Sequence, residues 1–567
     1  MPHAPERRPR LRAALRRTTP TPALAWLLLL LGSVPAWATP GAVATEHQLA
    51  ADAGAELLRG GGNAVDAAIA AAAAICVVHA QSCGIGGGGF ALVRRADGRV
   101  DALDFRETAP AAATPERFFE DGTPAPERLR RGGLAVAVPG EVAGWVTLHA
   151  RHGQAPLAAV LAPAIRLARD GVPLADAPTL RSAIERTAEL LRADPDLRAI
   201  FLGPGGALPA PDARIVQADL ARTLEAVVAH GRAAFYAGDV AARIAAAVAA
   251  RGGVLTTDDL AAYRPQWRTA LRDTYRGHDV WTFPPPGSGG IVLEVLGILG
   301  ADQPTRADAL TAPWLHLLAG ALAQGFTDRA RWYGDPGFTD VPVAHLLAPA
   351  RLADIRRALA SPTRVTPQVD PPRDAGTANV SVVTGDGVAV ALTTTINTSF
   401  GAGIAVPGTG IVLNNEMDDF AVAPGVPNVY GLLGSEANAV RPGKRPQSSM
   451  SPTIVVAGDR PALVVGGSGG PLIISGTTEV LLNAIALGMD VPAAVAAPRI
   501  HDQGVPPAIV VEPGVPAATR EALARYGHPI KELRALGAVS AVAMLADGGF
   551  AAAGDPRKDG GQAIVPR

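Results

Sequence analysis

The sequence changes character near residue 370, and this change limits the folds that the chain can adopt. Earlier segments, such as residues 313–332, carry apolar residues at helical spacing. Later segments are short apolar runs of strand length, beginning with residues 380–384 and 388–396 on either side of a Gly-Asp-Gly turn. Because helices and strands are both abundant, the sequence predicts a layered fold with sheets packed between helices.

The polar, turn-rich stretch 370–376 joins these two parts and ends directly before Thr377. A threonine hydroxyl is a weak nucleophile that needs a base. If the chain were cut before Thr377, the new α-amine, with a pKa of about 8, would be a base within reach of that hydroxyl. Gly376 has no side chain to shield its carbonyl from attack. Thr377 is therefore a candidate N-terminal nucleophile, and an ordinary threonine at the start of a strand is the alternative.

The N-terminus has the pattern of a secretory signal. Six arginines lie within residues 7–17, and an apolar run follows at residues 23–31. The small first and third residues of Ala-Trp-Ala at 36–38 fit cleavage after Ala38. The run has about 10 residues, whereas a membrane span needs roughly 20. We expect residues 1–38 to be a signal peptide and the mature protein to be periplasmic or secreted, without a stable membrane span; an uncleaved anchor is the alternative.

Composition and short motifs argue against several other classes of protein. With 18% charged and 48% hydrophobic residues and a net charge of −1, the 567-residue chain resembles a large globular protein and not a nucleic-acid-binding one. Residues 84–89 match the dinucleotide pattern G-x-G-x-x-G, but a helix is predicted before them and a strand after them, the reverse of the required order. His149 and His152 lack the glutamate and spacing of a zinc-protease helix, so we expect no metal site and no cofactor.

The chain has two cysteines, Cys76 and Cys83. An oxidising compartment permits a disulfide between them, but a large domain does not need one. The sequence leaves both a bridge and two unpaired thiols open, and neither cysteine is a candidate nucleophile.

Four polar segments follow Thr377 in a fixed order. They are Thr-Thr-Thr-Ile-Asn-Thr-Ser-Phe-Gly at 393–401, Leu-Asn-Asn-Glu-Met-Asp-Asp-Phe at 413–420, Lys-Arg-Pro-Gln-Ser-Ser-Met-Ser-Pro at 444–452 and Gly-Gly-Ser-Gly-Gly at 466–470. The earlier part of the chain adds Gly-Gly-Asn-Ala-Val-Asp-Ala-Ala at 61–68, Gly-Gly-Gly-Gly-Phe at 86–90, Asp-Phe-Arg-Glu at 104–107 and Ala-Val-Pro-Gly at 137–140. Together these segments, over nearly the whole mature chain, resemble the gamma-glutamyltransferases (glutathione hydrolases), which are N-terminal nucleophile hydrolases.

The resemblance implies an α+β fold, the four-layer αββα sandwich of the N-terminal nucleophile hydrolases. It implies a precursor that cuts itself between Gly376 and Thr377 into a large subunit, residues 39–376, and a small catalytic subunit, residues 377–567. The expected substrates are glutathione and other gamma-glutamyl compounds, with water, amino acids or dipeptides as acceptors. Nucleic acid is not an expected partner.

The resemblance also assigns roles to individual residues. Thr395 would hydrogen-bond the nucleophile Thr377 and assist self-cleavage, and the backbone of Gly469 and Gly470 would form the oxyanion hole, where glycine permits close approach. Tyr430, within a lid-like segment at 427–434, would be the gate over the pocket.

A gamma-glutamyl donor carries an α-carboxylate and an α-ammonium, which call for different partners. Arg106, Ser448 and Ser449 match the carboxylate clamp of the family, in keeping with the preference of a carboxylate for a guanidinium and hydroxyls. The ammonium would meet carboxylates and an amide oxygen at positions that match Asn397, Glu416 and Asp419. Taken singly, each of these residues is better explained by a surface or turn position, whereas taken together in the family order they favour the functional interpretation.

Two positions depart from the family pattern. Asn379 stands where many relatives have histidine, and Pro471 stands where serine or threonine is common, which removes a hydroxyl and an N–H near the oxyanion hole. Three alternatives remain: a glutaryl-cephalosporin acylase, a poly-gamma-glutamate depolymerase or transferase, and a non-catalytic protein that binds gamma-glutamyl peptides. Asp419 and the lid-like segment favour glutamyl substrates, and Thr377 argues against a non-catalytic protein.

Overall fold

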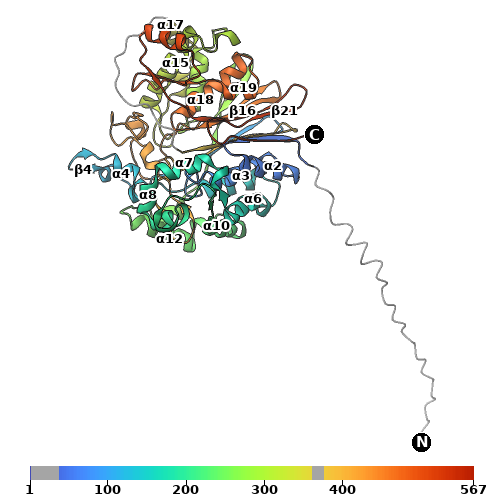
Figure 1. The fold of residues 1–567 in the computed structure, drawn as a ribbon, viewed down its shortest axis with the longest axis vertical. Coiled ribbons are helices and arrows are strands. Elements are labelled where there is room, and N and C mark those ends of the chain that lie inside the picture. The colour runs from blue at the N-terminus through green and yellow to red at the C-terminus, as the bar shows by residue number, and fades with distance from the viewer. Residues whose placement is uncertain (2–37, 360–375) are drawn as a thin grey trace. The chain divides into compact units, whose positions relative to one another are not determined.

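Two antiparallel sheets form the centre of the fold in the computed structural model, which describes Met1, residues 38–359 and residues 376–567 (Figure 1). Residues 38–567 cluster as one unit. The predicted leader lies outside the described residues except for its two ends, and so does the linker 370–376 except for Gly376. No helix within the described ranges is long and apolar enough to cross a membrane.

Strands from both sides of Thr377 share each sheet. The first sheet has the order β22 (Gly561–Val565), β1 (Gly41–Thr45), β11 (Ala378–Thr384), β12 (Ala389–Thr395), β2 (Gly88–Arg94), β3 (Val100–Phe105) and β8 (Gln266–Thr269). The second has the order β21 (Phe550–Ala553), β20 (Ala538–Met544), β16 (Arg460–Ser468), β15 (Thr453–Ala457), β10 (His278–Thr282) and β9 (Leu271–Tyr275).

Side-chain alternation along the strands separates the apolar interior into clusters. Ala391 of β12 and Val464 of β16 belong to one cluster, which contains residues of both sheets. Their neighbours point the other way: Leu392 joins a cluster with the helices that follow β1, and Val465 joins a cluster with a different set of helices. Since side chains alternate between the two faces of a strand, both faces of the central strands are buried.

Helices cover the outward faces of the sheets. Residues of α2 (Gln48–Arg59) and α3 (Ala64–Val78) pack in the cluster of the first sheet, and those of α14 (Gly289–Ile298), α15 (Ala312–Trp332) and α18 (Leu472–Leu481) pack in that of the second. In Figure 1 the labels α15, α18 and α19 lie on one side of β16 and β21, and α2, α3, α6 and α10 lie on the other. Further helices are α5 (Glu141–His152), α6 (Leu157–Asp170), α7 (Pro178–Arg186), α10 (Ala218–His230), α12 (Gly238–Ala249), α17 (Pro349–Ala358), α19 (Val491–Ala496) and α20 (Ala517–Arg525).

The expected helix at 313–332 and the expected strands at 380–384 and 388–396 are present, with boundaries within two residues of those expected. The apolar pattern at residues 476–487 also predicts a helix. In the structure this helix, α18, begins earlier, at Leu472, and continues into a π-helical turn, Leu482–Ala486. Its first turn was missed because it follows a glycine pair and a proline, which are typical of loops. The glycine run at 84–89 is indeed preceded by a helix, α3, and its last two residues begin β2. An added Cβ at Gly87 would lie 1.9 Å from the carbonyl oxygen of Thr395, so that glycine allows close packing beside the site.

Candidate active site

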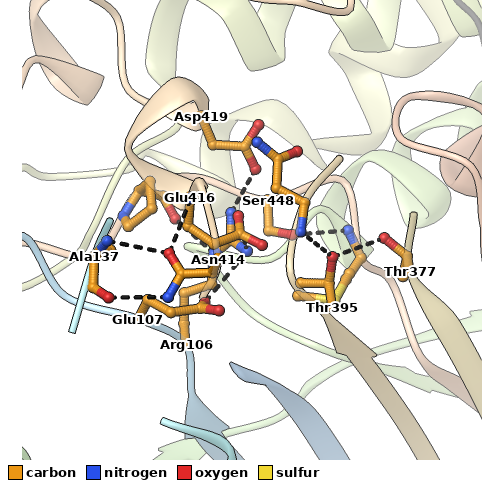
Figure 2. Close-up of polar contacts among 12 residues, drawn as sticks. Arg106, Glu107, Ala137, Thr377, Thr395, Asn414, Glu416, Asp419 and Ser448 are labelled. Atoms are coloured by element: carbon orange, nitrogen blue, oxygen red, sulfur yellow. Dashed lines mark hydrogen bonds and ion pairs between the residues drawn. The ribbon is translucent and has the colours of Figure 1, made fainter. Parts of the chain in front are cut away.

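Thr377 lies buried directly before β11, beside the end of β12. Its Oγ1 is 3.0 Å from the Oγ1 of Thr395, the last residue of β12, and Figure 2 shows the two hydroxyls facing each other. The N–H of Thr377 donates to the carbonyl of Ser82 at 2.9 Å. The Oγ1 of Thr395 also accepts the N–H of Asn397 at 2.8 Å, which fixes the orientation of the hydroxyl that faces Thr377.

The backbone at the predicted cleavage point has an unusual conformation. Gly376 has φ +82° and Thr377 has φ +71°, a left-handed geometry that a β-branched residue rarely adopts and that costs about 1–2 kcal/mol. An added Cβ on Gly376 would lie 2.0 Å from the carbonyl oxygen of Asn397. A side chain at position 376 is therefore excluded by both its φ angle and its surroundings.

Arg106 is buried at the end of β3 among three carboxylates. Its guanidinium lies 2.6 Å from Glu416, 2.5 Å from Asp419 and 3.6 Å from Glu107 (Figure 2). Burial alone would lower the pKa of Arg106, but the carboxylates of Glu416 and Asp419 raise it above its ordinary value. Arg106 therefore remains charged, and the predicted carboxylate-binding cation lies beside two of the three predicted ammonium-binding groups.

Glu107 belongs to this cluster but was not among the predicted site residues. It is fully buried, and burial raises its pKa to about 8; neither of its carboxylate oxygens makes a hydrogen bond within the described part of the chain. Burial also raises the pKa of Glu416 well above its ordinary value. The segment 104–107 that resembles the family includes Glu107, but neighbouring residues of a strand normally point to opposite faces, so a place beside Arg106 in the same cluster was not expected.

The segment with Ser448 and Ser449 lies against Arg106. The Arg106 guanidinium donates to the carbonyls of Pro446 at 3.4 Å and Gln447 at 3.3 Å, directly before the two serines. Both serines are buried, at 3% and 7% exposure.

Two residues that no sequence motif indicated hold this segment. Ser288 donates from Oγ to the Ser448 carbonyl at 2.5 Å, and the Nε of Arg329 on α15 donates to Ser288 at 3.1 Å. The Ser288–Ser448 contact spans 160 residues of sequence and the Arg329–Ser288 contact spans 41, so no local motif could indicate the role of these residues.

Gly469 and Gly470 form a loop between β16 and α18. Both have positive φ, +117° and +61°, and an added Cβ on Gly470 would lie 2.7 Å from the ring of Tyr430. Pro471 occupies the N-cap position of α18. A helix start leaves its first N–H groups without intrahelical partners, so a proline is tolerated there. The positive end of the helix dipole lies beside the glycine pair, which favours an anion at this point.

Tyr430 lies over this loop and is 6% exposed, so it is not an exposed loop aromatic. Its hydroxyl contacts the side-chain oxygen of Asn397 at 2.8 Å and the carbonyl of Asn397 at 3.1 Å. The Asn428 side chain accepts the N–H groups of Tyr430 and Leu432, at 3.0 and 3.1 Å, and thereby shapes the predicted lid.

Asn379 takes part in a buried network between the two sheets. Its side chain donates to Ser540 at 2.8 Å and to Ser381 at 3.1 Å, and it accepts from Thr393 at 3.0 Å. The side-chain oxygen and nitrogen of Asn379 therefore both have hydrogen-bond partners.

The cysteines lie beside the end of β12, where the Sγ of Cys76 is 3.8 Å from the Oγ1 of Thr394. The Sγ atoms of Cys76 and Cys83 are 2.7 Å apart, without a disulfide bond between them. Burial raises the pKa of each thiol. No group of three or more His, Cys, Asp or Glu side chains in residues 38–359 and 376–567 is arranged to hold a metal ion. His149 instead contacts the Ala155 carbonyl, and His152 contacts Asp101.

Known proteins resemble the chain over almost its full length. Residues 50–565 match the family model described as Gamma-glutamyltranspeptidase. A glutathione hydrolase proenzyme from Escherichia coli (strain K12) is 40% identical over 532 residues, which are 92% of this chain and 91% of the relative. An acylase ACY 1 proenzyme from Pseudomonas sp. (strain SE83) is 37% identical over 538 residues, which are 93% of this chain and 94% of the relative.

A solved structure extends the likeness to the fold. The cephalosporin acylase from Bacillus halodurans superposes with a TM-score of 0.81 at 31% identity, covering 93% of this chain and 96% of that chain. The mixed α+β fold is therefore shared with these proteins. Since the family model spans most of the sequence and the relatives match it nearly from end to end, the chain belongs to the gamma-glutamyltranspeptidase family of enzymes.

Proposed function

We propose that this enzyme is made as a precursor that cuts itself before Thr377 and then uses that residue to hydrolyse or transfer gamma-glutamyl groups, with glutathione as a substrate. The observation that carries the proposal is the buried pair of Thr377 and Thr395 hydroxyls directly after a strained glycine–threonine junction. The Arg106 cluster supplies charges for the α-carboxylate and α-ammonium of a glutamyl donor.

Self-cleavage starts from the strained junction. The Oγ1 of Thr377 loses its proton, with Thr395 as its hydrogen-bond partner, and attacks the Gly376 carbonyl carbon. The C–N bond to Thr377 breaks as its nitrogen takes up a proton, which leaves an ester between Gly376 and the Thr377 oxygen. Water hydrolyses the ester and frees the α-amine of Thr377. Release of the left-handed threonine geometry favours the forward direction.

The processed enzyme then uses the amine as its base. It accepts the proton of Oγ1 as that oxygen attacks the γ-amide, and the N–H groups of Gly469 and Gly470 stabilise the oxyanion beside the start of α18. The leaving amine departs protonated, and water or an acceptor amine takes the glutamyl group from the ester. Arg106, with Ser448 and Ser449, holds the α-carboxylate, while Glu416, Asp419 and Asn397 hold the ammonium.

This proposal also covers the architecture and the location of the enzyme. We infer a leader of residues 1–38, a large subunit of residues 39–376 and a small subunit of residues 377–567, exported to the periplasm or the medium. The two clusters of helices outside the two sheets support the four-layer αββα arrangement of N-terminal nucleophile hydrolases.

Denaturing gels and mass spectrometry of wild type and Thr377→Ala test the proposal. Wild type should run as two bands of roughly 35 and 19 kDa, in proportion to residue number in the 57.8 kDa chain, and the smaller should begin with Thr377. The Thr377→Ala variant should stay as one band and be inactive on a gamma-glutamyl anilide. Active wild-type enzyme with an unbroken chain at residue 377 would refute the proposal.

A second candidate is glutaryl-cephalosporin acylase activity, since acylases resemble the chain over more than nine tenths of its length. A glutaryl group has no α-ammonium, so it would not use Asp419. Asp419 lies in contact with Arg106, and Asn428 of the lid reaches it at 3.4 Å. Parallel assays with a gamma-glutamyl anilide, with and without glycylglycine, and with glutaryl-cephalosporin distinguish the two; Asp419→Ala should reduce only the glutamyl reactions.

A further inference from the structure

Lys558 is a buried cation beside Thr377, and no motif in the sequence drew attention to it. It lies between β21 and β22, and its side chain is 5% exposed. The Nζ atom is 2.7 Å from Ser468 Oγ, 3.1 Å from Glu46 Oε2 and 3.5 Å from the carbonyl oxygen of Thr377. A single ammonium group therefore reaches three separate segments of the site.

Each of these three contacts connects Lys558 to a segment of the proposed active site. Ser468 is the last residue of β16 and directly precedes the glycine pair. Glu46 follows β1, and its other carboxylate oxygen accepts the N–H of Asn379 at 3.2 Å, two residues after the nucleophile. The Thr377 carbonyl belongs to the peptide bond with Ala378, so this contact would survive cleavage on the other side of Thr377.

The turn that carries Lys558 is held at both ends. Asp559, the next residue, contacts His79 at 3.0 Å and the hydroxyl of Thr179 at 2.6 Å. The carboxylate of Asp555, three residues earlier, pairs with the buried Arg499 at 2.7 Å, and the backbone carbonyl of Asp555 accepts the N–H of Lys558. The ammonium is therefore placed by a rigid turn and does not depend on a flexible tail.

We propose that Lys558 is a positioning residue of the active site, which fixes the main chain of Thr377 against the glycine loop. Its positive charge also keeps the α-amine released at Thr377 unprotonated near neutral pH. The inference rests on the proposed self-cleavage. A nearby cation disfavours the charged form of an amine and lowers its pKa, whereas the carboxylate of Glu46 acts in the opposite direction.

Other ionisable groups surround the Thr377 backbone, and most keep one charge state through the neutral range. Burial lowers the pKa of His79 to about 4 and raises those of Cys76 and Cys83, so all three stay neutral. Burial also lowers the pKa of His47. Burial would raise the pKa of Asp559, but its hydrogen bonds with His79 and Thr179 lower that pKa below its ordinary value.

Glu141 contacts Thr394 on β12, and burial raises its pKa to about 8. It therefore titrates within the range of the assay. Since the substitutions below leave Glu141 and Thr394 unchanged, its titration should contribute equally to every variant.

Changing the two charges separately and together tests the inference on processed enzyme. The measurement is the pH dependence of kcat/KM for a gamma-glutamyl anilide, with gels to quantify processing. Lys558→Met leaves Glu46 unopposed, so the acidic limb should move up by about one pH unit. Glu46→Gln should move it down, and Glu46→Gln with Lys558→Met should return it close to wild type. Lys558→Arg keeps the charge and should move the limb least among the single variants.

Lys531→Met, a lysine substitution on β19 (Ile530–Glu532), is the matched control and should leave the profile unchanged. An acidic limb that stays in place in both Lys558→Met and Glu46→Gln overturns the inference. So does a double variant shifted as far as Lys558→Met, because a purely structural role would not be rescued by removing the second charge. If Lys558→Met fails to fold or process, Glu46→Gln alone decides by the sign of its shift. Uncut or inactive wild-type protein would instead refute the proposed function.

Discussion

Replacing Thr395 by valine removes one hydroxyl and keeps nearly the same shape. That hydroxyl has two partners, the nucleophile oxygen of Thr377 at 3.0 Å and the N–H of Asn397 at 2.8 Å. In the variant, the buried N–H of Asn397 loses its acceptor, which costs about 1–3 kcal/mol of folding stability. The Thr377 hydroxyl loses an orienting bond worth about 0.5–1.5 kcal/mol, so we expect self-cleavage and turnover to slow by up to about tenfold.

Two assays separate the two effects. The conversion of precursor to two bands, followed over time on denaturing gels, reports self-cleavage. Turnover of a gamma-glutamyl anilide per processed molecule reports the effect on catalysis, and urea unfolding reports the loss of folding stability. Thr395→Ser is the matched control because it keeps the hydroxyl and loses only a methyl group, and it should process almost normally. A valine variant that is cut at the wild-type rate and turns over within about twofold of wild type would refute this reasoning.

Three further substitutions probe the rest of the site. Gly470→Ala places a Cβ 2.7 Å from the Tyr430 ring at φ +61°, so activity should fall more than about tenfold. Gly458→Ala is its control, since Gly458 has a similar φ of +64° but lies in open space; it should lower the unfolding free energy in urea by only about 1–2 kcal/mol. Tyr430→Phe loses two hydrogen bonds to Asn397 but keeps the ring, so kcat/KM should fall by roughly three- to tenfold with little change in the unfolding midpoint. Glu141→Gln should gain stability relative to wild type as the pH rises from 5 to 9. Burial raises the Glu141 pKa to about 8, so the folded protein retains a proton that the unfolded chain loses above about pH 4.5. The free energy of unfolding of the wild type therefore falls as the pH rises between these two pKa values. If the difference in unfolding free energy between Glu141→Gln and wild type is the same at pH 5 and at pH 9, this prediction is wrong.

The sequence predicted the central strands because their pattern is local. The Gly-Asp-Gly turn and the apolar runs around it indicated β11 and β12, which are present at Ala378–Thr384 and Ala389–Thr395. It missed β1 because five small, fully buried residues lack any alternation. It also missed β8, β9, β10 and α14. β8 and β10 pair with β3 and β15, far along the chain, and α14 packs in the cluster of the second sheet, although β9 and β10 form a local hairpin.

The site shows the same division between local and distant information. The motifs indicated Thr377, Arg106 and Asp419, and the structure brings Arg106 into contact with Asp419, which is 313 residues away. Lys558 and Arg329 could not be inferred in this way, since an isolated lysine or arginine in a sequence is most often a surface residue. Burial and partners, which only the folded chain defines, distinguish these two cations from the rest.

The order of strands in the first sheet has a consequence for what happens after a cut at residue 377. β1 precedes Thr377 in the chain, yet it is bonded on one side to β11 and on the other to β22, which both follow it. Neither chain could dissociate without breaking the backbone hydrogen bonds on both sides of β1, so cleavage would yield two chains that stay together in one particle. Once denatured, that particle would have to reassemble from two molecules, which makes recovery dependent on concentration. The working life of the mature enzyme would then be governed by how slowly it unfolds.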